Sequence, residues 1–172
     1  MLTGRSVLLI IGGGIAAYKA LEVIRLIARA GGRTKPVLTA AAAEFVTPLS
    51  AAALAGAKAY GALFDLTDEA EMGHIQLSRS ADLVVVAPAT ADLMAKAANG
   101  LADDLASTLL LATDKRVLYA PAMNVRMWEH PAVRRNLAAL RADGALVVGP
   151  DDGEMACGEF GPGRMAEPAA IV

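Results

Sequence analysis

The segment 81–105 constrains the fold most, because a short apolar run passes directly into helix-forming sequence. The uninterrupted run Leu83–Ala87 is typical of a parallel strand that is covered on both faces. The following Pro88–Asp92 predicts the end of this strand and the start of a helix, with a hydroxyl from Thr90 and a carboxylate from Asp92. Ligands of open α/β sheets bind at this carboxyl edge. The alternative is an ordinary strand-to-helix turn in which Thr90 or Asp92 only caps the helix.

Alternating apolar runs and helical segments predict an α/β fold with a Rossmann-like, three-layer arrangement, in which helices flank a central parallel sheet. Strands are expected at about 7–11, 36–39, 59–64, 83–87, 116–120 and 145–148. Helices are expected at about 15–30, 40–45, 49–54, 94–98, 102–111 and 131–142. The length of 172 residues, without an internal repeat or a linker, predicts a single domain over 1–172.

Composition narrows the class of protein. Hydrophobic residues make up 55% of the chain, yet no apolar run approaches the roughly 20 residues that a membrane-spanning helix needs. The 16 basic and 18 acidic residues are dispersed, which argues against nucleic acid as a partner. A signal-peptide pattern is absent from the first residues, so we expect a cytoplasmic protein. The single cysteine excludes an intrachain disulfide, and we expect no metal site.

The glycine run Gly12–Gly14 follows the first strand and precedes the first helix. This arrangement directs free backbone N–H groups at an anion, and the missing Cβ atoms let the anion approach closely. Ala17 stands where a dinucleotide fingerprint would have its third glycine, so a mononucleotide phosphate fits better. Thr39, at the end of the second strand, is a further candidate contact for phosphate or flavin. The alternatives are a simple tight turn at the glycines and a capping role for Thr39.

Two strand ends share the pattern Ala-Pro-Ala followed by Thr or Met, which predicts two loops that converge on one pocket. Asn124, in the second loop, offers an amide that is suited to holding a carboxylate. His74 is expected in a loop, after an acidic loop at 65–71, where function is common. Taken alone, His74 could equally cap a helix or lie on the surface, and Met127 could belong to the core.

The segment Gly149–Met165 differs in character from the rest, with five glycines and two prolines in 17 residues. A loop of this length is typically a lid, so we expect a substrate-binding flap over these residues. The flap carries the only thiol of the chain, Cys157. The alternative, an unreactive buried cysteine, is hard to reconcile with a mobile glycine-rich segment.

Four sequence blocks together resemble the flavin-dependent cysteine decarboxylases. They are GGGIAAYKA at 12–20, the run from GHIQLSRS to LADDL at 73–105, PAMNVRMW at 121–128 and ACGEFGPGRM at 156–165. The central block is more similar to the coenzyme A branch than to the peptide-modifying branch. The resemblance therefore implies FMN-dependent decarboxylation of 4′-phosphopantothenoyl-L-cysteine to 4′-phosphopantetheine, by transient oxidation to a thioaldehyde, loss of CO₂ and re-reduction of the enethiol.

The resemblance also implies roles for individual residues. The catalytic residues would be His74, Asn124 as the carboxylate-binding group and Cys157 as the final proton donor. The substrate would contact Arg79, Asn124, Met127, Ala156 and Cys157. FMN would contact Gly12, Gly13, Gly14, Ile15, Thr39, Phe45, Pro88, Ala89, Thr90, Ala91, Asp92, Ala122 and Met123. Many family members carry Ser or Thr in place of Gly12, which here removes a hydroxyl from the phosphate and puts FMN affinity in doubt.

Family members are homotrimers or assemblies of trimers, so the resemblance implies a homo-oligomer with FMN near a subunit interface. It also implies a phosphopantothenate–cysteine ligase as a fused or separate partner, since the chain ends about where fused relatives continue into that enzyme. Three rival functions are a peptidyl-cysteine decarboxylase, a prenyl-flavin synthase and a non-catalytic flavin-binding regulatory subunit. Retention of Cys157 argues against the peptidyl-cysteine decarboxylase, and the block PAMNVRMW argues against the prenyl-flavin synthase. The joint presence of His74, Asn124 and Cys157 favours an enzyme over the regulatory subunit.

Overall fold

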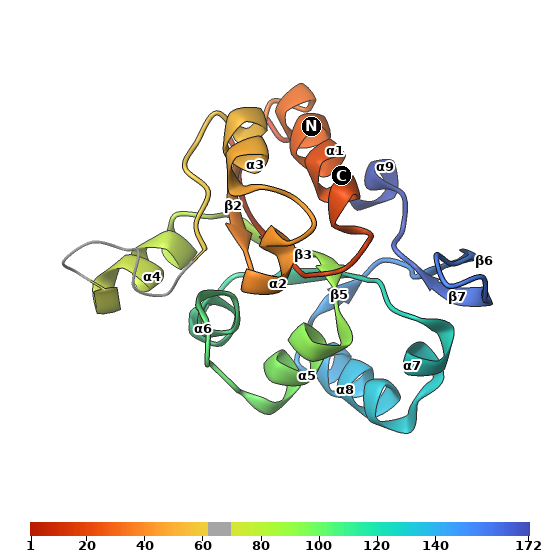
Figure 1. The fold of residues 1–172 in the computed structure, drawn as a ribbon. Helices are drawn as coiled ribbons and strands as arrows, with labels where there is room; N and C mark the ends of the chain where they lie inside the picture. Colours follow the sequence, from red (N-terminus) through yellow and green to blue (C-terminus); the bar gives the residue numbers. More distant parts are fainter. Residues whose placement is uncertain (62–69) are drawn as a thin grey trace.

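A five-stranded parallel sheet forms the centre of the molecule (Figure 1). The computed structural model describes residues 1–61 and 70–172, and of residues 70–72 it describes the backbone alone. The spatial order of the strands is β2-β1-β3-β4-β5. Their bounds are Ser6–Ile11 for β1, Arg33–Leu38 for β2, Leu83–Ala89 for β3, Val117–Pro121 for β4 and Leu146–Val147 for β5. The predicted α/β fold with a parallel central sheet is confirmed.

Helices cover both faces of the sheet (Figure 1). One face carries α1 (Ala17–Arg29), α3 (Pro48–Ala55) and α9 (Pro168–Ile171). The other face carries α5 (Ala91–Asn99), α6 (Leu105–Ala112) and α8 (Pro131–Ala142). The remaining helices are α2 (Ala40–Ala43), α4 (Ala70–Arg79) and α7 (Val125–Glu129). Across 1–61 and 70–172, no helix combines the length and the hydropathy needed to cross a membrane.

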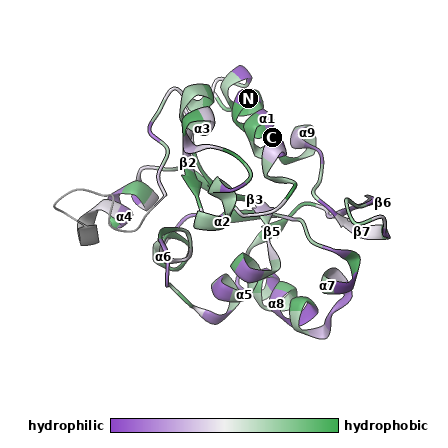
Figure 2. Ribbon diagram, in the orientation of Figure 1, coloured by the Kyte–Doolittle hydropathy of each residue, from purple (hydrophilic) through white to green (hydrophobic). Residues whose placement is uncertain are grey.

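Strand β1 lies between β2 and β3 and is buried along its whole length. Leu9 and Ile11 pack toward α1, whereas Leu8 and Ile10 pack toward α5 and α6 on the opposite face. Each such side chain contributes roughly 1.5–3 kcal/mol through burial. Figure 2 shows the same distribution, with hydrophobic strands inside and hydrophilic residues on outward parts of α5 and α7. The apolar composition of the chain is therefore accounted for by two hydrophobic layers around a doubly covered sheet.

The strand order creates a crevice at the carboxyl ends of β1 and β3. The chain leaves β1 through α1 and returns on one side as β2, and it later enters β3 on the other side of β1. The connections after β1 and β3 therefore run to opposite faces of the sheet, which is the topological switch point where ligands of doubly wound folds bind. This position is where the sequence predicts the ligand site.

The prediction that prolines end the two central strands is wrong by one or two residues. Strand β3 continues through Pro88 to Ala89, and β4 includes Pro121. The Pro88 carbonyl accepts a hydrogen bond from the Gly12 N–H at 3.2 Å, so the residue still takes part in pairing. The pairing register of β3 with β4 shifts between Val86 and Ala89, which accommodates the missing proline N–H.

The expected third strand at 59–64 is not formed in the described part, where Tyr60 makes only an isolated parallel bridge to Val37. Residues 62–64, and most of the expected acidic loop at 65–71, lie outside the described residues. The prediction that His74 lies in a loop is wrong, because His74 lies in α4. Tertiary packing of α4 against α6 decides this segment, and the glycine before His74 does not interrupt the helix.

The predicted flap is a β-hairpin and not an irregular loop. Strand β6 (Asp151–Glu154) pairs antiparallel with β7 (Phe160–Arg164), and the turn between them carries Cys157. The Gly158 N–H bonds to the Met155 carbonyl at 2.9 Å, and Gly158 adopts a positive φ of 82°. Glycine tolerates this conformation without a steric cost, so the glycine at this position reflects turn geometry.

We expect Gly13→Ala to destabilise the protein, because a Cβ atom at this position would lie 2.3 Å from the Cβ of Ala41 and 2.6 Å from its carbonyl carbon. Overpacking of this kind costs about 1–3 kcal/mol. The matched control is Gly14→Ala, where an added Cβ would have no atom within 4 Å. Urea unfolding of the three proteins measures the difference, and equal stabilities of the two variants would contradict this packing.

Candidate functional site

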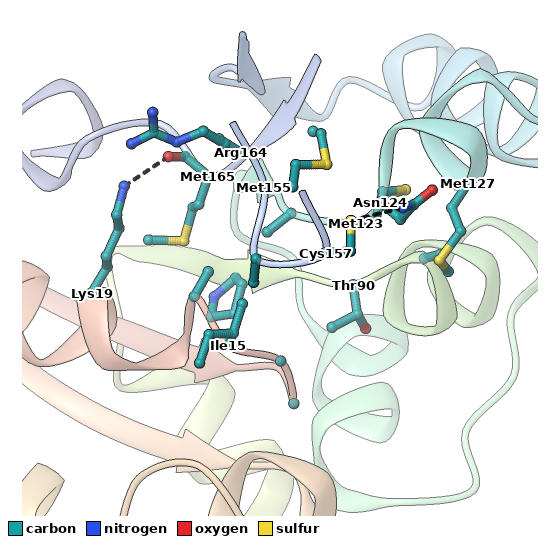
Figure 3. Close-up of a pocket in the computed structure, with 18 of the residues that line it drawn as sticks. Ile15, Lys19, Thr90, Met123, Asn124, Met127, Met155, Cys157, Arg164 and Met165 are labelled. Carbon is teal, nitrogen blue, oxygen red and sulfur yellow. Dashed lines mark hydrogen bonds between the residues drawn. The ribbon is translucent and has the colours of Figure 1, made fainter. Parts of the chain in front are cut away.

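A cavity of about 790 Å³ opens at the carboxyl edge of the sheet. Its walls come from the N-terminus of α1, the ends of β3 and β4, and the β6–β7 hairpin (Figure 3). The lining residues are Gly13, Gly14, Ile15, Ala16, Tyr18, Lys19, Pro88, Thr90, Ala91, Ala122, Met123, Asn124, Met127, Glu154, Met155, Ala156, Cys157, Gly163, Arg164 and Met165. A cavity of this size is large enough for a drug-sized ligand or a cofactor.

Four strand ends pass directly into helix N-termini around this cavity. Thr39, Thr90 and Asn124 cap α2, α5 and α7, and each side-chain oxygen accepts a backbone N–H at 3.0, 3.2 and 2.8 Å respectively. The N-cap of α1, Ala16, provides no side-chain acceptor. The Ala17 N–H donates to the Gly14 carbonyl at 2.9 Å and the Lys19 N–H to the Ala16 carbonyl at 3.0 Å. The N–H groups of Gly14 and Ile15, in the loop before α1, are not used in this way, and they line the cavity where they suit an anion.

A smaller cavity of about 340 Å³ adjoins the first and shares Gly13, Thr90, Ala91 and Met127 with it. Thr39, Asp92 and Lys96 are among the residues that line only this second cavity. Lys96 Nζ lies 3.1 Å from a carboxylate oxygen of Asp92 and 3.1 Å from one of Asp103. The hydrogen bond that Lys96 donates to the Asp92 carboxylate is the main cause of a raised Lys96 pKa. Asp92 and Lys96, both on α5, therefore form an ion pair.

Asn124 joins the flap to the end of β4. Its Nδ2 donates to the Glu159 carboxylate and to the Cys157 sulfur, the latter at 3.4 Å. The Cys157 thiol donates to Glu159 Oε2 at 3.6 Å, and Arg126 Nε donates to Glu159 Oε1 at 3.3 Å. The hydrogen bond from the Asn124 amide is the largest cause that lowers the pKa of Glu159, and those from Arg126 and Cys157 act in the same direction. Glu159 is therefore a carboxylate at neutral pH.

A backbone contact fixes the flap on this loop. The Met123 N–H donates to the Gly163 carbonyl at 3.0 Å. A Cβ atom at Gly163 would lie 2.2 Å from the Met123 carbonyl oxygen, so only glycine permits this approach. The second glycine of the Gly-Pro-Gly-Arg-Met sequence therefore serves docking of the hairpin, and this docking brings Cys157 to the cavity.

The structure brings together most of the residues predicted from sequence. The large cavity is lined by Gly13, Gly14, Ile15, Pro88, Thr90, Ala91, Ala122, Met123, Asn124, Met127, Ala156 and Cys157, and the small one also by Thr39 and Asp92. Neither cavity is lined by Gly12, Phe45, His74, Arg79 or Ala89. The N–H of Gly12 is used by Pro88, and Ala89 is fully buried in the sheet.

His74 and Arg79 lie on α4, which packs against α6. In Figure 1 this helix stands at the opposite side of the molecule from the β6–β7 hairpin. Within one copy of the chain, His74 therefore does not meet Asn124 and Cys157 across the cavity.

Comparison with known proteins identifies the family. The chain matches the Flavoprotein family over residues 1–172. It belongs to the Flavoprotein family. The chain is 48% identical over 171 residues to the coenzyme A biosynthesis bifunctional protein CoaBC of Vibrio parahaemolyticus, covering 99% of this chain and 43% of that protein. It is 45% identical over 172 residues to CoaBC of Bacillus subtilis, covering 100% of this chain and 42% of that protein.

Two solved structures share the arrangement of this Flavoprotein chain. One is a PPC decarboxylase variant complexed with pantothenoylaminoethenethiol, with a TM-score of 0.84, 32% identity, and coverage of 97% of this chain and 93% of that chain. The other is the FMN-dependent cysteine decarboxylase SpaF, with a TM-score of 0.80, 34% identity, and coverage of 94% and 91%. The chain spans less than half the length of the CoaBC relatives that it matches.

Several residues of this Flavoprotein site were missed by sequence reasoning. Glu159 was detectable from the sequence, because it is the second residue after Cys157 in the flap. A carboxylate at this spacing can accept a hydrogen bond from the thiol. Lys19 was detectable as a cation in the first turn of the helix that follows the glycine loop. Tyr18, Met155 and Met165 gave no signal, because only the docked hairpin and α1 bring them to the cavity. Within 1–61 and 70–172, no His, Cys, Asp and Glu side chains cluster as a metal site.

We expect Asn124→Asp to loosen the flap without unfolding the protein. Aspartate can still cap α7, so the free energy of unfolding should change by no more than about 0.5 kcal/mol. The variant loses both amide donors and places a second carboxylate beside Glu159. Hydrogen exchange of residues 151–164 measures the opening, which should accelerate relative to the rest of the chain. Unchanged exchange would show that Asn124 does not hold the hairpin.

Proposed function

We propose that this chain catalyses FMN-dependent decarboxylation of 4′-phosphopantothenoyl-L-cysteine to 4′-phosphopantetheine, a carbon–carbon lyase reaction of coenzyme A biosynthesis. The observation that carries the proposal is the meeting of Asn124 and Cys157 in one cavity, beside the glycine loop that precedes α1. An amide for a carboxylate and a thiol for a proton are two of the protein groups that this reaction uses. The likeness to CoaBC proteins and to a PPC decarboxylase supports the substrate.

The residues of the cavity fit FMN. The open N–H groups at Gly14 and Ile15 suit its phosphate, and a Cβ position at Gly14 has no atom within 4 Å. The hydroxyls of Thr39 and Thr90 accept backbone N–H groups and keep their own protons for donation. Ile15 and Met127 offer apolar walls to a flat ring, and their side chains are 65% and 47% exposed. When bound, FMN supplies reversible two-electron oxidation at the substrate carbon beside sulfur.

Asn124 binds and orients the substrate carboxylate. Its Oδ1 accepts the Arg126 N–H at 2.8 Å, which directs the NH₂ group toward the flap and the cavity. Holding the carboxylate in a fixed orientation lowers the entropic part of the barrier, an effect that in well-oriented systems reaches several kcal/mol. The amide is neutral, so it holds the carboxylate without stabilising its charge as strongly as a cation would. This property is compatible with the loss of the group as CO₂.

Cys157 donates the proton that completes the product. Its thiol lies in the hairpin turn and is exposed in the absence of substrate, while the backbone around it lines the cavity. Docking of the hairpin through Met123 and Gly163 fixes the distance between the thiol and Asn124. A closed hairpin also excludes water from reactive sulfur-bearing intermediates.

His74 acts on the substrate thiol from a neighbouring subunit. An imidazole is a common general acid or base in enzymes that work at neutral pH. Because α4 stands away from the cavity of its own chain, we propose a homotrimer in which α4 of one copy reaches the cavity of the next. Exposed apolar side chains such as Tyr18, Phe45 and Leu49, which are 60%, 50% and 79% exposed, support such an interface.

Cytoplasmic location and a fused or separate phosphopantothenate–cysteine ligase belong to the same proposal, and the bifunctional CoaBC relatives support the partner. A peptidyl-cysteine decarboxylase would release the enethiol and would need no proton donor in the flap. A regulatory flavin-binding subunit would need neither Asn124 nor Cys157 in its cavity. The contact between these two residues favours the coenzyme A reaction over both.

Purified protein with FMN should be yellow, release CO₂ from 4′-phosphopantothenoyl-L-cysteine and form 4′-phosphopantetheine, as measured by mass spectrometry of the product. Cys157→Ser is the matched control, since it should still release CO₂ but accumulate the enethiol without its final proton. Activity on a peptide with a C-terminal cysteine, in the absence of activity on the small substrate, would contradict the proposal.

Mixing two inactive variants tests the shared site. His74→Asn and Cys157→Ser should each fail to form the product. In randomly mixed oligomers, about a quarter of the sites would combine an intact His74 from one copy with an intact Cys157 from the next. Refolding the variants together should therefore restore product formation, whereas a site contained in one chain would give none.

A further inference from the structure

The carboxylate-binding group of the proposed site already holds a carboxylate of its own chain. Asn124 has two amide hydrogens, and these point to the Glu159 carboxylate and to the Cys157 sulfur. Figure 3 shows Asn124 and Cys157 directed toward each other at one end of the cavity. A substrate carboxylate that accepts the amide hydrogen directed at Glu159 must therefore replace Glu159.

The orientation of the Asn124 amide cannot reverse without cost. Its Oδ1 accepts the Arg126 N–H and caps α7, so a flipped amide would place NH₂ against this donor. The donors remain fixed toward the flap whether or not a ligand is present. An acceptor that approaches the NH₂ group therefore competes with Glu159 for one hydrogen atom and with the Cys157 sulfur for the other.

Glu159 is held in place from its other side. Arg126 Nε donates to Oε1 at 3.3 Å, while Oε2 faces Asn124 and accepts from the Cys157 thiol at 3.6 Å. The Arg126 side chain is largely exposed, so this ion pair can persist while the carboxylate swings away from Asn124. One carboxylate oxygen of Glu159 therefore binds the exposed guanidinium of Arg126, and the other binds the Asn124 amide in the cavity.

We propose that Glu159 is an internal substitute for the substrate's carboxylate, a latch that occupies Asn124 in the unliganded enzyme and that only a carboxylate-bearing ligand displaces. This inference rests on the proposed function. A ligand without a carboxylate leaves the Asn124–Glu159 contact intact, so the latch weakens the binding of carboxylate-bearing ligands and leaves the binding of the product unchanged. Glu159 is thus a specificity-determining residue that acts through Asn124.

Displacement of the latch also has a consequence for Cys157. In the unliganded enzyme the thiol hydrogen is directed to Glu159. When the substrate carboxylate replaces Glu159 at Asn124, the thiol loses this acceptor and its hydrogen becomes available to the substrate. The loss of CO₂ then vacates Asn124 and lets Glu159 return, which favours release of the carboxylate-free product.

Glu159→Gln tests the latch, because it keeps the shape and an acceptor oxygen but replaces a charged hydrogen bond by a weaker neutral one. The probes are 4′-phosphopantothenoyl-L-alanine, which carries the carboxylate but no reactive sulfur, and 4′-phosphopantetheine, which carries no carboxylate. Titration calorimetry on the FMN-loaded protein gives the dissociation constant of each. We expect Glu159→Gln to bind the alanine analogue about fivefold more tightly than the wild type, with unchanged affinity for phosphopantetheine.

Asp152→Asn is the matched control, since Asp152 lies exposed on the same hairpin and should leave both dissociation constants unchanged. Unchanged or weaker binding of the alanine analogue by Glu159→Gln would overturn the latch. An equal gain for both probes would also overturn it, because Glu159 would then only restrict opening of the flap. Failure of the wild type to bind either probe would instead contradict the proposed function.

Discussion

The close approach of backbone segments at the carboxyl ends of β1 and β3 is the constraint on which the site depends. The Gly12 N–H bonds to the Pro88 carbonyl, and Gly13 packs against the backbone of α2 with no room for a Cβ atom. These contacts fix the loop before α1 against the end of β3. Because the connections after these strands leave toward opposite faces, the fixed loop borders an open cavity and not a packed core.

The second half of the site is added by a hairpin distant in sequence. Strand β7 contacts the end of β4 through Met123 and Gly163, and the turn before it delivers Cys157 to Asn124. The cavity therefore has a rigid floor made by the sheet and a cover made by a two-stranded element. A pair of strands that is held at one end by a backbone bond can move at its tip, which suits a cover that must admit substrate.

Electrostatics links the floor and the cover. The Asn124 amide holds Glu159 as a carboxylate, and Arg126 and the Cys157 thiol support the same charge state. A buried unpaired carboxylate would be costly, but this one is only half-buried and surrounded by donors, so it can exchange partners at little cost. In the proposed mechanism, the same exchange lets one amide hold either Glu159 or the carboxylate of the substrate.

The sequence by itself determined the parallel α/β fold, the glycine loop and the two strand ends that converge on one pocket. These features are local, because apolar runs, prolines and glycines act on the backbone within a few residues. The tertiary structure decided that His74 lies in α4 away from the cavity, that the flap is a hairpin, and that Glu159 meets Asn124. Each of these depends on packing between segments far apart in the chain, which no local pattern records.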